Sequence, residues 1–270
     1  MNRIIKYLFI SGLLFFYSCE NAVVENDLIY EERLVVRGLL VAGNPIEVTF
    51  ERTLPLDQPF DSTKAQLSDV TAYITHNDVI DTLQYTSAGK YRSSAMIAQN
   101  GEGYKLSAEW NGKSLTGETS VPYTTTFQNG KIITEVNENG DTVHYIQGLL
   151  TPREGAVYGA SWVILDPLSG FHLEDNVIPV LLRESDKDLN NRLTLKTRNI
   201  PDTLYATWHN SFYIRVHAFD EEFYNFFVTQ DANNASSNIF SQSGINLRWN
   251  VEGDGIGMFI GESDYYVKVF

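Results

Sequence analysis

From Arg33 onward the chain is a succession of short segments in which apolar and polar residues alternate, separated by turn residues. Residues 45–53 show the pattern, with Ile46, Val48 and Phe50 at every second position. This period places alternate side chains on one face of a β-strand, so each segment predicts a strand with one buried face. Many such strands bury those faces only by packing sheets together, and the sequence therefore predicts a mainly β fold.

The first part of the chain, residues 33–122, is expected to form an N-terminal β-sandwich of immunoglobulin-like or prealbumin-like kind. We expect its strands at 33–41, 45–53, 69–76, 78–86, 89–94, 103–110 and 113–121. The last two are joined by Asn111-Gly112, which favours a hairpin because a type I′ turn needs positive φ at both central positions. Residues 54–66 contain two prolines and no period, and are interpreted as a surface loop.

A proline and a threonine run then interrupt the alternation, and we place a domain boundary near Tyr123. Residues 123–270 are expected to form a second antiparallel β-domain. Its strands are predicted at 130–136, 142–150, 156–165, 177–183, 192–197, 211–219 and 264–270.

One segment of this second domain has a helical period. Phe219, Phe223, Phe226 and Phe227 recur at positions i, i+4, i+7 and i+8, and Asp220 is suited to cap a helix start. We therefore expect one short amphipathic helix near residues 220–230. Packing of its apolar face against the sheet is the favoured interpretation, with a lipid or partner contact as the alternative.

The first 18 residues have the layout of a bacterial lipoprotein signal peptide. Arg3 and Lys6 precede an apolar stretch at 7–17, which is too short to span a membrane. Cys19, the only cysteine, follows a small residue at the end of this stretch, as in a lipobox. We predict that Cys19 is the lipidated first residue of the mature protein and that 19–32 form a tether; the alternative is an ordinary signal peptide with a chance cysteine.

The charge balance limits the partners of such a protein. The formal net charge is −14, and the predicted signal peptide carries basic residues but no acidic ones, so the mature chain is more acidic still. This surface repels phosphate groups, and we expect no nucleic acid partner. The lipid on Cys19 would attach the protein to the outer membrane, facing either the cell surface or the periplasm.

No catalytic motif is visible in the sequence. There is no G-x-S-x-G elbow, and the five histidines lack metal-binding spacing. Ser161 lies inside a predicted strand. Carboxylate pairs of a glycoside hydrolase meet in space rather than in sequence, so that alternative stays open. We expect a protein without enzymatic activity or cofactor.

Residues 184–197 contain a weak calcium candidate formed by Asp186, Asp188 and Asn190, whose alternate spacing matches the start of a calcium loop. Asn191 replaces the glycine of an EF-hand, and Thr197 replaces its final glutamate, so the EF-hand itself is excluded. A polar turn between strands is the favoured interpretation. No other metal site is expected.

Residues 250–263 contain four glycines, Gly253, Gly255, Gly257 and Gly261. A dinucleotide-binding loop needs a strand before its glycines and a helix after them, whereas here a strand-like segment follows. We interpret the first two glycines as a tight turn and the last two as points where strands bend or pack closely. The tryptophans, including Trp249, are expected chiefly in the core, with ligand contact as the alternative.

Six segments together resemble the Bacteroidota outer-membrane lipoprotein family known as domain of unknown function 4249. They are 32–56, 70–74, 89–94, 103–122, 221–227 and 250–263, with the lipobox at Cys19 before them. The resemblance implies an accessory of a TonB-dependent nutrient transporter, active in substrate capture or complex assembly, with a small molecule, glycan or peptide as ligand. It supplies no catalytic residues. The alternatives are a glycan- or peptide-acting hydrolase and a structural protein of the cell envelope.

Overall fold

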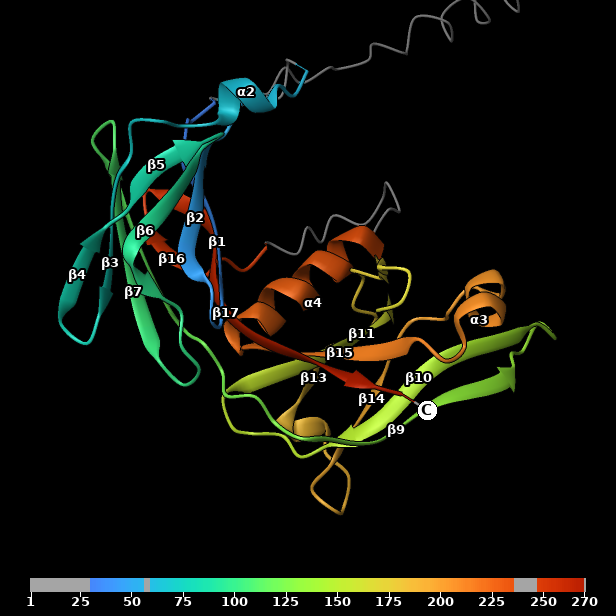
Figure 1. The fold of residues 1–270 in the computed structure, drawn as a ribbon. Helices are drawn as coiled ribbons and strands as arrows, with labels where there is room; N and C mark the ends of the chain where they lie inside the picture. Colours follow the sequence, from blue (N-terminus) through green and yellow to red (C-terminus); the bar gives the residue numbers. More distant parts are fainter. Residues whose placement is uncertain (1–29, 56–58, 236–246, 270) are drawn as a thin grey trace, which may run out of the picture. The chain divides into compact units, whose positions relative to one another are not determined.

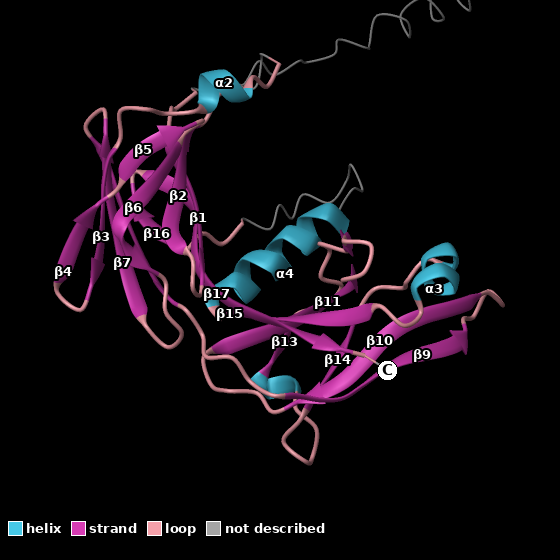
Figure 2. Cartoon of the chain, in the orientation of Figure 1, coloured by secondary structure: helices cyan, strands magenta, loops and turns pink. Residues whose placement is uncertain are grey.

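The structure is a computed structural model that describes residues 30–55, 59–235 and 247–269. Glu32–Phe270 form one compact unit. It is mainly β, with several antiparallel sheets and few helices, which confirms the predicted fold class (Figures 1 and 2). The signal peptide and Cys19 lie outside the described residues. Within the described part, no helix has both the length and the apolar character needed to cross a membrane.

The first part of the unit is a β-sandwich. Its strands are β1 (Leu34–Val41), β2 (Pro45–Arg52), β3 (Thr71–His76), β4 (Val79–Thr82), β5 (Gln84–Ser87), β6 (Lys90–Ile97), β7 (Gly103–Trp110) and β8 (Lys113–Ser120). One layer contains β1, β2, β6 and β5, and the other contains β8, β7, β3 and β4. Phe50, Tyr91 and Leu106 are among the buried residues that fill the first core between them.

Three local predictions for this sandwich can be compared directly with the backbone. Asn111 and Gly112 have φ of 48° and 73°, as the predicted type I′ hairpin between β7 and β8 requires. The single strand predicted at 78–86 is wrong: the segment divides into β4 and β5, which belong to different sheets. The division falls at buried Leu83, whose N–H donates to the Ala72 carbonyl oxygen. The loop predicted at 54–66 includes a short helix, α2 (Ser62–Ala65).

The rest of the chain builds a second pair of layers and also adds β16 to the β8 edge of the first sandwich. Its strands are β9 (Phe127–Val136), β10 (Thr142–Leu150), β11 (Ala156–Asp166), β12 (Phe171–Glu174), β13 (Leu182–Arg183), β14 (Leu193–Lys196), β15 (Phe212–Asp220), β16 (Val251–Gly253) and β17 (Gly255–Lys268). Its helical segments are η2 (Glu184–Asp186), α3 (Asp202–Trp208) and α4 (Glu222–Ala235). The sheet β14-β10-β9 packs on β11, β15 and β17, and residues such as Tyr158, Trp162 and Ile146 fill the second core.

Two predictions for this part need correction. The strand expected at 177–183 is wrong except for its last two residues, which form β13. Pro179 has no N–H for a ladder, and the segment instead places Ile178 and Leu181 against the sheet. The helix is present as α4 but begins at Glu222, while Phe219 belongs to strand β15. Phe219 still contacts the helix, with its ring centroid 4.5 Å from that of Phe223.

Strand β17 joins the two cores. Residues 255–262 of β17 pair in parallel with β1, and residues 262–268 pair antiparallel with β15. The result is a nine-stranded shared sheet that runs β12-β11-β15-β17-β1-β2-β6-β5, with β13 also paired to β11 (Figure 1). The boundary near Tyr123 falls between β8 and β9 and stays a prediction.

Candidate ligand pocket and buried polar network

The glycine segment lies where the chain passes from one sheet into another. β16 pairs with β8 at the edge of the five-stranded sheet, and β17 then enters the shared sheet beside β1. Between them, Asp254 N donates to Ser114 O at 2.7 Å, and Ser114 N donates to Asp254 Oδ2 at 3.1 Å. This pairing holds the turn closed against the start of β8.

The glycines allow backbones to approach more closely than any side chain permits. A Cβ at Gly257, whose φ is +134°, would lie 2.0 Å from the carbonyl oxygen of Val36 in β1. A Cβ at Gly261 would lie 2.1 Å from the carbonyl oxygen of Ser120 at the end of β8. Both contacts are with backbone atoms, which cannot rotate away. The segment is therefore a structural crossing, and its geometry leaves no space for a phosphate between the strands.

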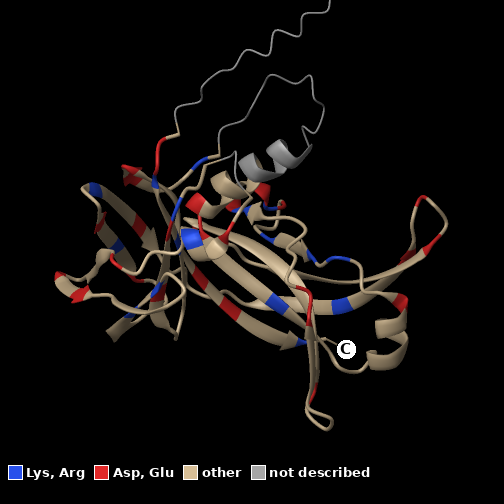
Figure 3. Ribbon diagram, turned by 90° about the horizontal axis from the view of Figure 1, so that it is seen from above, with Lys and Arg blue, Asp and Glu red and all other residues tan. Residues whose placement is uncertain are grey.

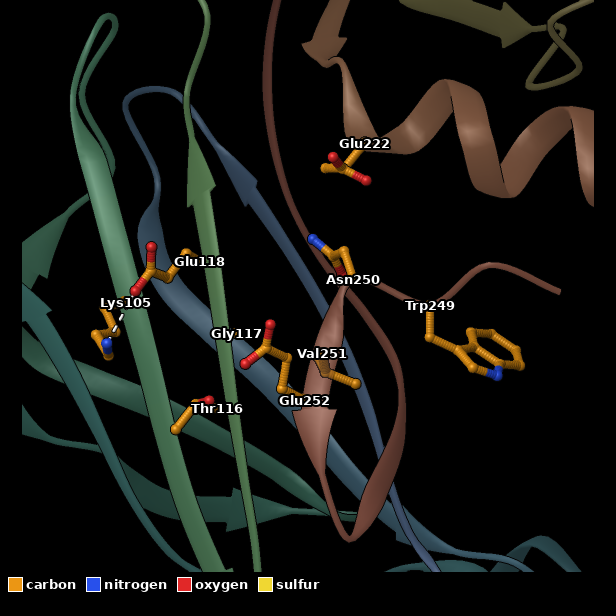
Figure 4. Close-up of a pocket in the computed structure, with 9 residues that line it drawn as sticks. All are labelled: Lys105, Thr116, Gly117, Glu118, Glu222, Trp249, Asn250, Val251 and Glu252. Carbon is orange, nitrogen blue, oxygen red and sulfur yellow. Dashed lines mark hydrogen bonds and ion pairs between the residues drawn. The ribbon is translucent and has the colours of Figure 1, made fainter.

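Next to this crossing is a surface pocket of about 520 Å³. Its walls are Lys105 of β7, residues 116–118 of β8, Glu222 at the start of α4, and residues 249–252. Figure 4 shows Lys105, Glu118 and Glu252 on the side of the β-strands, Glu222 on the side of α4, and Trp249 at the opposite end from Lys105. Segments from three distant parts of the sequence thus meet at one site.

Two hydrogen-bonded side chains fix the walls of this pocket. Asn250 Nδ2 donates to Phe259 O at 2.6 Å, and Phe259 N donates to Asn250 Oδ1 at 2.8 Å, so the amide imitates a neighbouring strand. Asp220 binds both β8 and the start of α4, accepting from Thr119 Oγ1 at 2.7 Å, Ser120 N at 2.9 Å and Glu222 N at 3.2 Å. Both walls are thereby tied to strands of the two sheets.

The charges of the pocket are unequal. Lys105 Nζ pairs with Glu118 Oε1 at 2.8 Å. The hydrogen bond and charge of Glu118, with a further contribution from the charge of Glu252, raise the pKa of Lys105 above its ordinary value. Among the described residues, neither Glu222 nor Glu252 has an ion-pair partner. Both carry charge in a protein whose acidic residues outnumber its basic ones and are spread over the whole described fold (Figure 3).

A second polar arrangement is buried in the shared sheet, on the face covered by α4. Ser161 of β11, His217 of β15 and Glu262 of β17 stand on adjacent strands. Ser161 Oγ lies 3.2 Å from His217 Nε2, and His217 Nδ1 lies 2.6 Å from Glu262 Oε1. Because a carboxylate only accepts, Nδ1 donates to Glu262, which leaves Nε2 to accept the Ser161 hydroxyl proton.

This connectivity is that of a Ser-His-acid catalytic triad, but its surroundings are those of a core. Ser161 is 0% exposed, and it lies within strand β11, where its residue partner on β15 is Arg215. The Phe219 ring lies parallel to the His217 ring, with centroids 5.6 Å apart. A substrate carbonyl has no access to the Ser161 hydroxyl in this arrangement. The network therefore supplies hydrogen bonds between the side chains of neighbouring strands inside the core.

The same face carries a neighbouring ion network. Arg215 Nη1 donates to Glu174 Oε1 and Arg215 Nε donates to Asp264 Oδ2, both at 2.5 Å. Burial on its own would lower the pKa of Arg215, but the hydrogen bond to Glu174 and the charge of Asp264 outweigh it, and the pKa is raised. The guanidinium therefore stays charged and links β12, β15 and β17.

The calcium candidate residues serve the local backbone. Asp188 Oδ1 accepts from Asn190 N at 2.8 Å and from Arg192 N at 2.9 Å, and Asp186 Oδ2 accepts from Arg183 N at 2.7 Å. These are contacts of a polar turn. In the described ranges there is no group of three or more His, Cys, Asp or Glu side chains that could hold a metal ion.

The sequence did not indicate either arrangement. Trp249 has no feature that separates it from the other tryptophans, and neither Ser161 nor any histidine has a neighbour at the spacing of a known motif. The alternation of polar residues at 211–219, which places Arg215 and His217 on one face of an otherwise apolar strand, is the signal that could have shown a buried polar face. The pairing of Ser161 with His217 depends on strand order, which the local pattern does not contain.

Comparison with known proteins identifies the family. The model of "Domain of unknown function (DUF4249)" matches residues 21–265. The chain belongs to the DUF4249 family. No curated protein matches it.

Solved structures share only remote similarity with this DUF4249 protein. A chain of a "Cytokine receptor complex" is 9% identical, with a TM-score of 0.23, and the match covers 68% of this chain and 89% of that one. β-Glucuronidase 3 of Bacteroides uniformis is 11% identical with a TM-score of 0.23, and the match covers 71% of this chain and 23% of that one. Similarity at this level carries no information about function.

Proposed function

We propose that this protein is a lipid-anchored, non-catalytic binding protein of the outer membrane that serves a TonB-dependent nutrient transporter, in substrate capture or complex assembly. The observation that carries the proposal is the open pocket between β8, β16 and α4, with a partly exposed tryptophan beside polar side chains. Such a pocket is a common form of binding site. The lipobox-like sequence at Cys19 supports attachment to the membrane.

Co-purification from the native membrane tests this role. An epitope tag inserted at the exposed turn formed by Glu138 to Gly140 avoids the C-terminal end, where Val269 directly after β17 is buried. We expect the tagged protein to recover a TonB-dependent transporter from detergent-solubilised outer membranes at native abundance. The Cys19→Ser variant should lose membrane attachment and most of the recovered transporter. Recovery of the tagged wild-type protein without any such transporter would contradict the proposal.

A hydrolase is the second candidate, because three carboxylates, those of Glu118, Glu222 and Glu252, line the pocket. Glycan hydrolysis uses a pair of carboxyl groups that flank the bond to be cleaved. We expect no turnover of glycan or peptide substrates by the purified protein above that of the Glu118→Gln/Glu252→Gln variant. Turnover that this double substitution abolishes would establish the hydrolase and overturn the non-catalytic role.

A further inference from the structure

We propose that the pocket beside Trp249 binds a positively charged amine or guanidinium group, carried either by a small polyamine or by a lysine or arginine side chain of a peptide. This inference rests on the proposed binding function and specifies the ligand class. Its volume of about 520 Å³ is within the ordinary range for small-ligand sites, about 300–1,000 Å³.

The hydrogen-bonding groups of the pocket favour a ligand that donates. Lys105 donates one of its three ammonium N–H groups to Glu118, and Asn250 donates one of its two amide N–H groups to the Phe259 carbonyl oxygen. Glu222 Oε2 accepts one long hydrogen bond, from Asn225 Nδ2 at 3.4 Å. The carboxylates of Glu222 and Glu252 only accept, and an ammonium or guanidinium group has donors alone. The carboxylate oxygens of the pocket are therefore matched by a cationic ligand.

The charge of the pocket favours the same ligand class. Three carboxylates face a single ammonium group, and that ammonium is paired with Glu118. Neither Glu222 nor Glu252 has an ion-pair partner among the described residues, so a cation in the pocket would add compensating positive charge near these carboxylates. An anionic ligand would meet repulsion at the same place.

Trp249 supplies an apolar surface for the ligand. Its side chain is 37% exposed, and its ring is supported by Phe226, with centroids 5.6 Å apart at an interplanar angle of 34°. The face of an indole attracts cations and also packs against methylene groups. A ligand with a cationic head and an aliphatic stem, such as a lysine side chain or a polyamine, would use both properties.

The walls of the pocket are held in place before a ligand arrives. The Asn250 amide is bonded to the backbone of β17, and Asp220 ties Glu222 at the start of α4 to the end of β8. A site whose groups are already ordered loses less conformational entropy on binding. This arrangement distinguishes the pocket from acidic residues scattered on a mobile surface.

Titration calorimetry on the full-length protein in detergent tests the proposal with four probes: spermidine, the peptide Gly-Lys-Gly with an acetylated N-terminus and an amidated C-terminus, the Nε-acetylated form of this capped peptide, and a neutral trisaccharide. We expect spermidine or Gly-Lys-Gly to bind, more weakly as salt increases, and the Nε-acetylated peptide and trisaccharide not to bind. Binding of spermidine alone indicates a small polyamine, and binding of the peptide indicates a protein side chain. The Glu222→Gln/Glu252→Gln variant should bind roughly tenfold more weakly, and Trp249→Ala about threefold.

The control is Glu138→Gln/Glu154→Gln, which removes the same formal charge from exposed positions outside this pocket and should leave the affinity unchanged. An equal loss in the control and pocket variants would mean non-specific attraction and overturn the site. Preference for the trisaccharide, or no binding of any probe, would overturn the cation proposal. Neither result bears on recovery of a transporter, which tests the membrane role separately.

Discussion

Replacing Gly257 with alanine is expected to remove a large part of the folding stability of the whole described unit. The new methyl group would lie 2.0 Å from the Val36 carbonyl oxygen, and the φ of +134° disfavours any residue with a Cβ. Backbone strain of this kind costs about 1–3 kcal/mol, and overpacking adds about 1–3 kcal/mol. The combined loss is a large part of the roughly 5–15 kcal/mol that stabilises a typical protein.

Three matched glycine variants separate the two causes in urea unfolding followed by tryptophan fluorescence. Gly112→Ala meets no atom within 4 Å but keeps a φ of +73°, so it should show only the backbone cost of about 1–2 kcal/mol. Gly261→Ala would meet the Ser120 carbonyl oxygen at 2.1 Å and should show mainly the steric cost. Gly257→Ala should exceed Gly112→Ala clearly. Equal unfolding midpoints for Gly257→Ala and wild type would refute the close crossing of β17 and β1.

The second large effect is expected from His217→Ala. This substitution leaves the Glu262 carboxylate buried, at 4% exposure, without its imidazole partner. Removing the hydrogen-bond donor of a buried carboxylate is expected to cost about 3 kcal/mol or more, because a buried charged group left without its partner costs more than the roughly 1–3 kcal/mol of a neutral one. The side chains of the network connect β11, β15 and β17, so the loss should appear in the free energy of unfolding of the whole unit.

Two control variants test whether the stability loss comes from the buried Glu262 carboxylate. Arg37→Ala removes an ion pair of similar length, 2.8 Å to Glu51, but the Arg37 side chain is 66% exposed, and the expected cost is below about 1 kcal/mol. Ser161→Ala removes only the hydroxyl and should cost about 1 kcal/mol. A His217→Ala variant no less stable than Arg37→Ala would show that the network is not a structural element.

Much of the fold follows from local patterns. Strand β7 coincides with the predicted segment 103–110, and β10 with 142–150, because alternation over eight or nine residues has a single interpretation. The positive φ of Asn111 and Gly112 follows from residue type alone. Where two structural states compete, local pattern fails: residues 177–181 are apolar enough for a strand, but they pack as a loop on the shared sheet, and only Leu182–Arg183 pair as β13.

The buried polar network and the pocket depend on contacts between residues that are far apart in the sequence. Ser161, His217 and Glu262 meet because β11, β15 and β17 are neighbours in the shared sheet, and the pocket forms because residues 249–252 lie beside β8 and the start of α4. The sequence by itself determined the mainly β class, the turns and, through the segments that define the family, membership of DUF4249. Only the tertiary structure decided that β17 pairs in parallel with β1, since that pairing is a contact across nearly the whole chain whose stabilisation is not encoded in neighbouring residues.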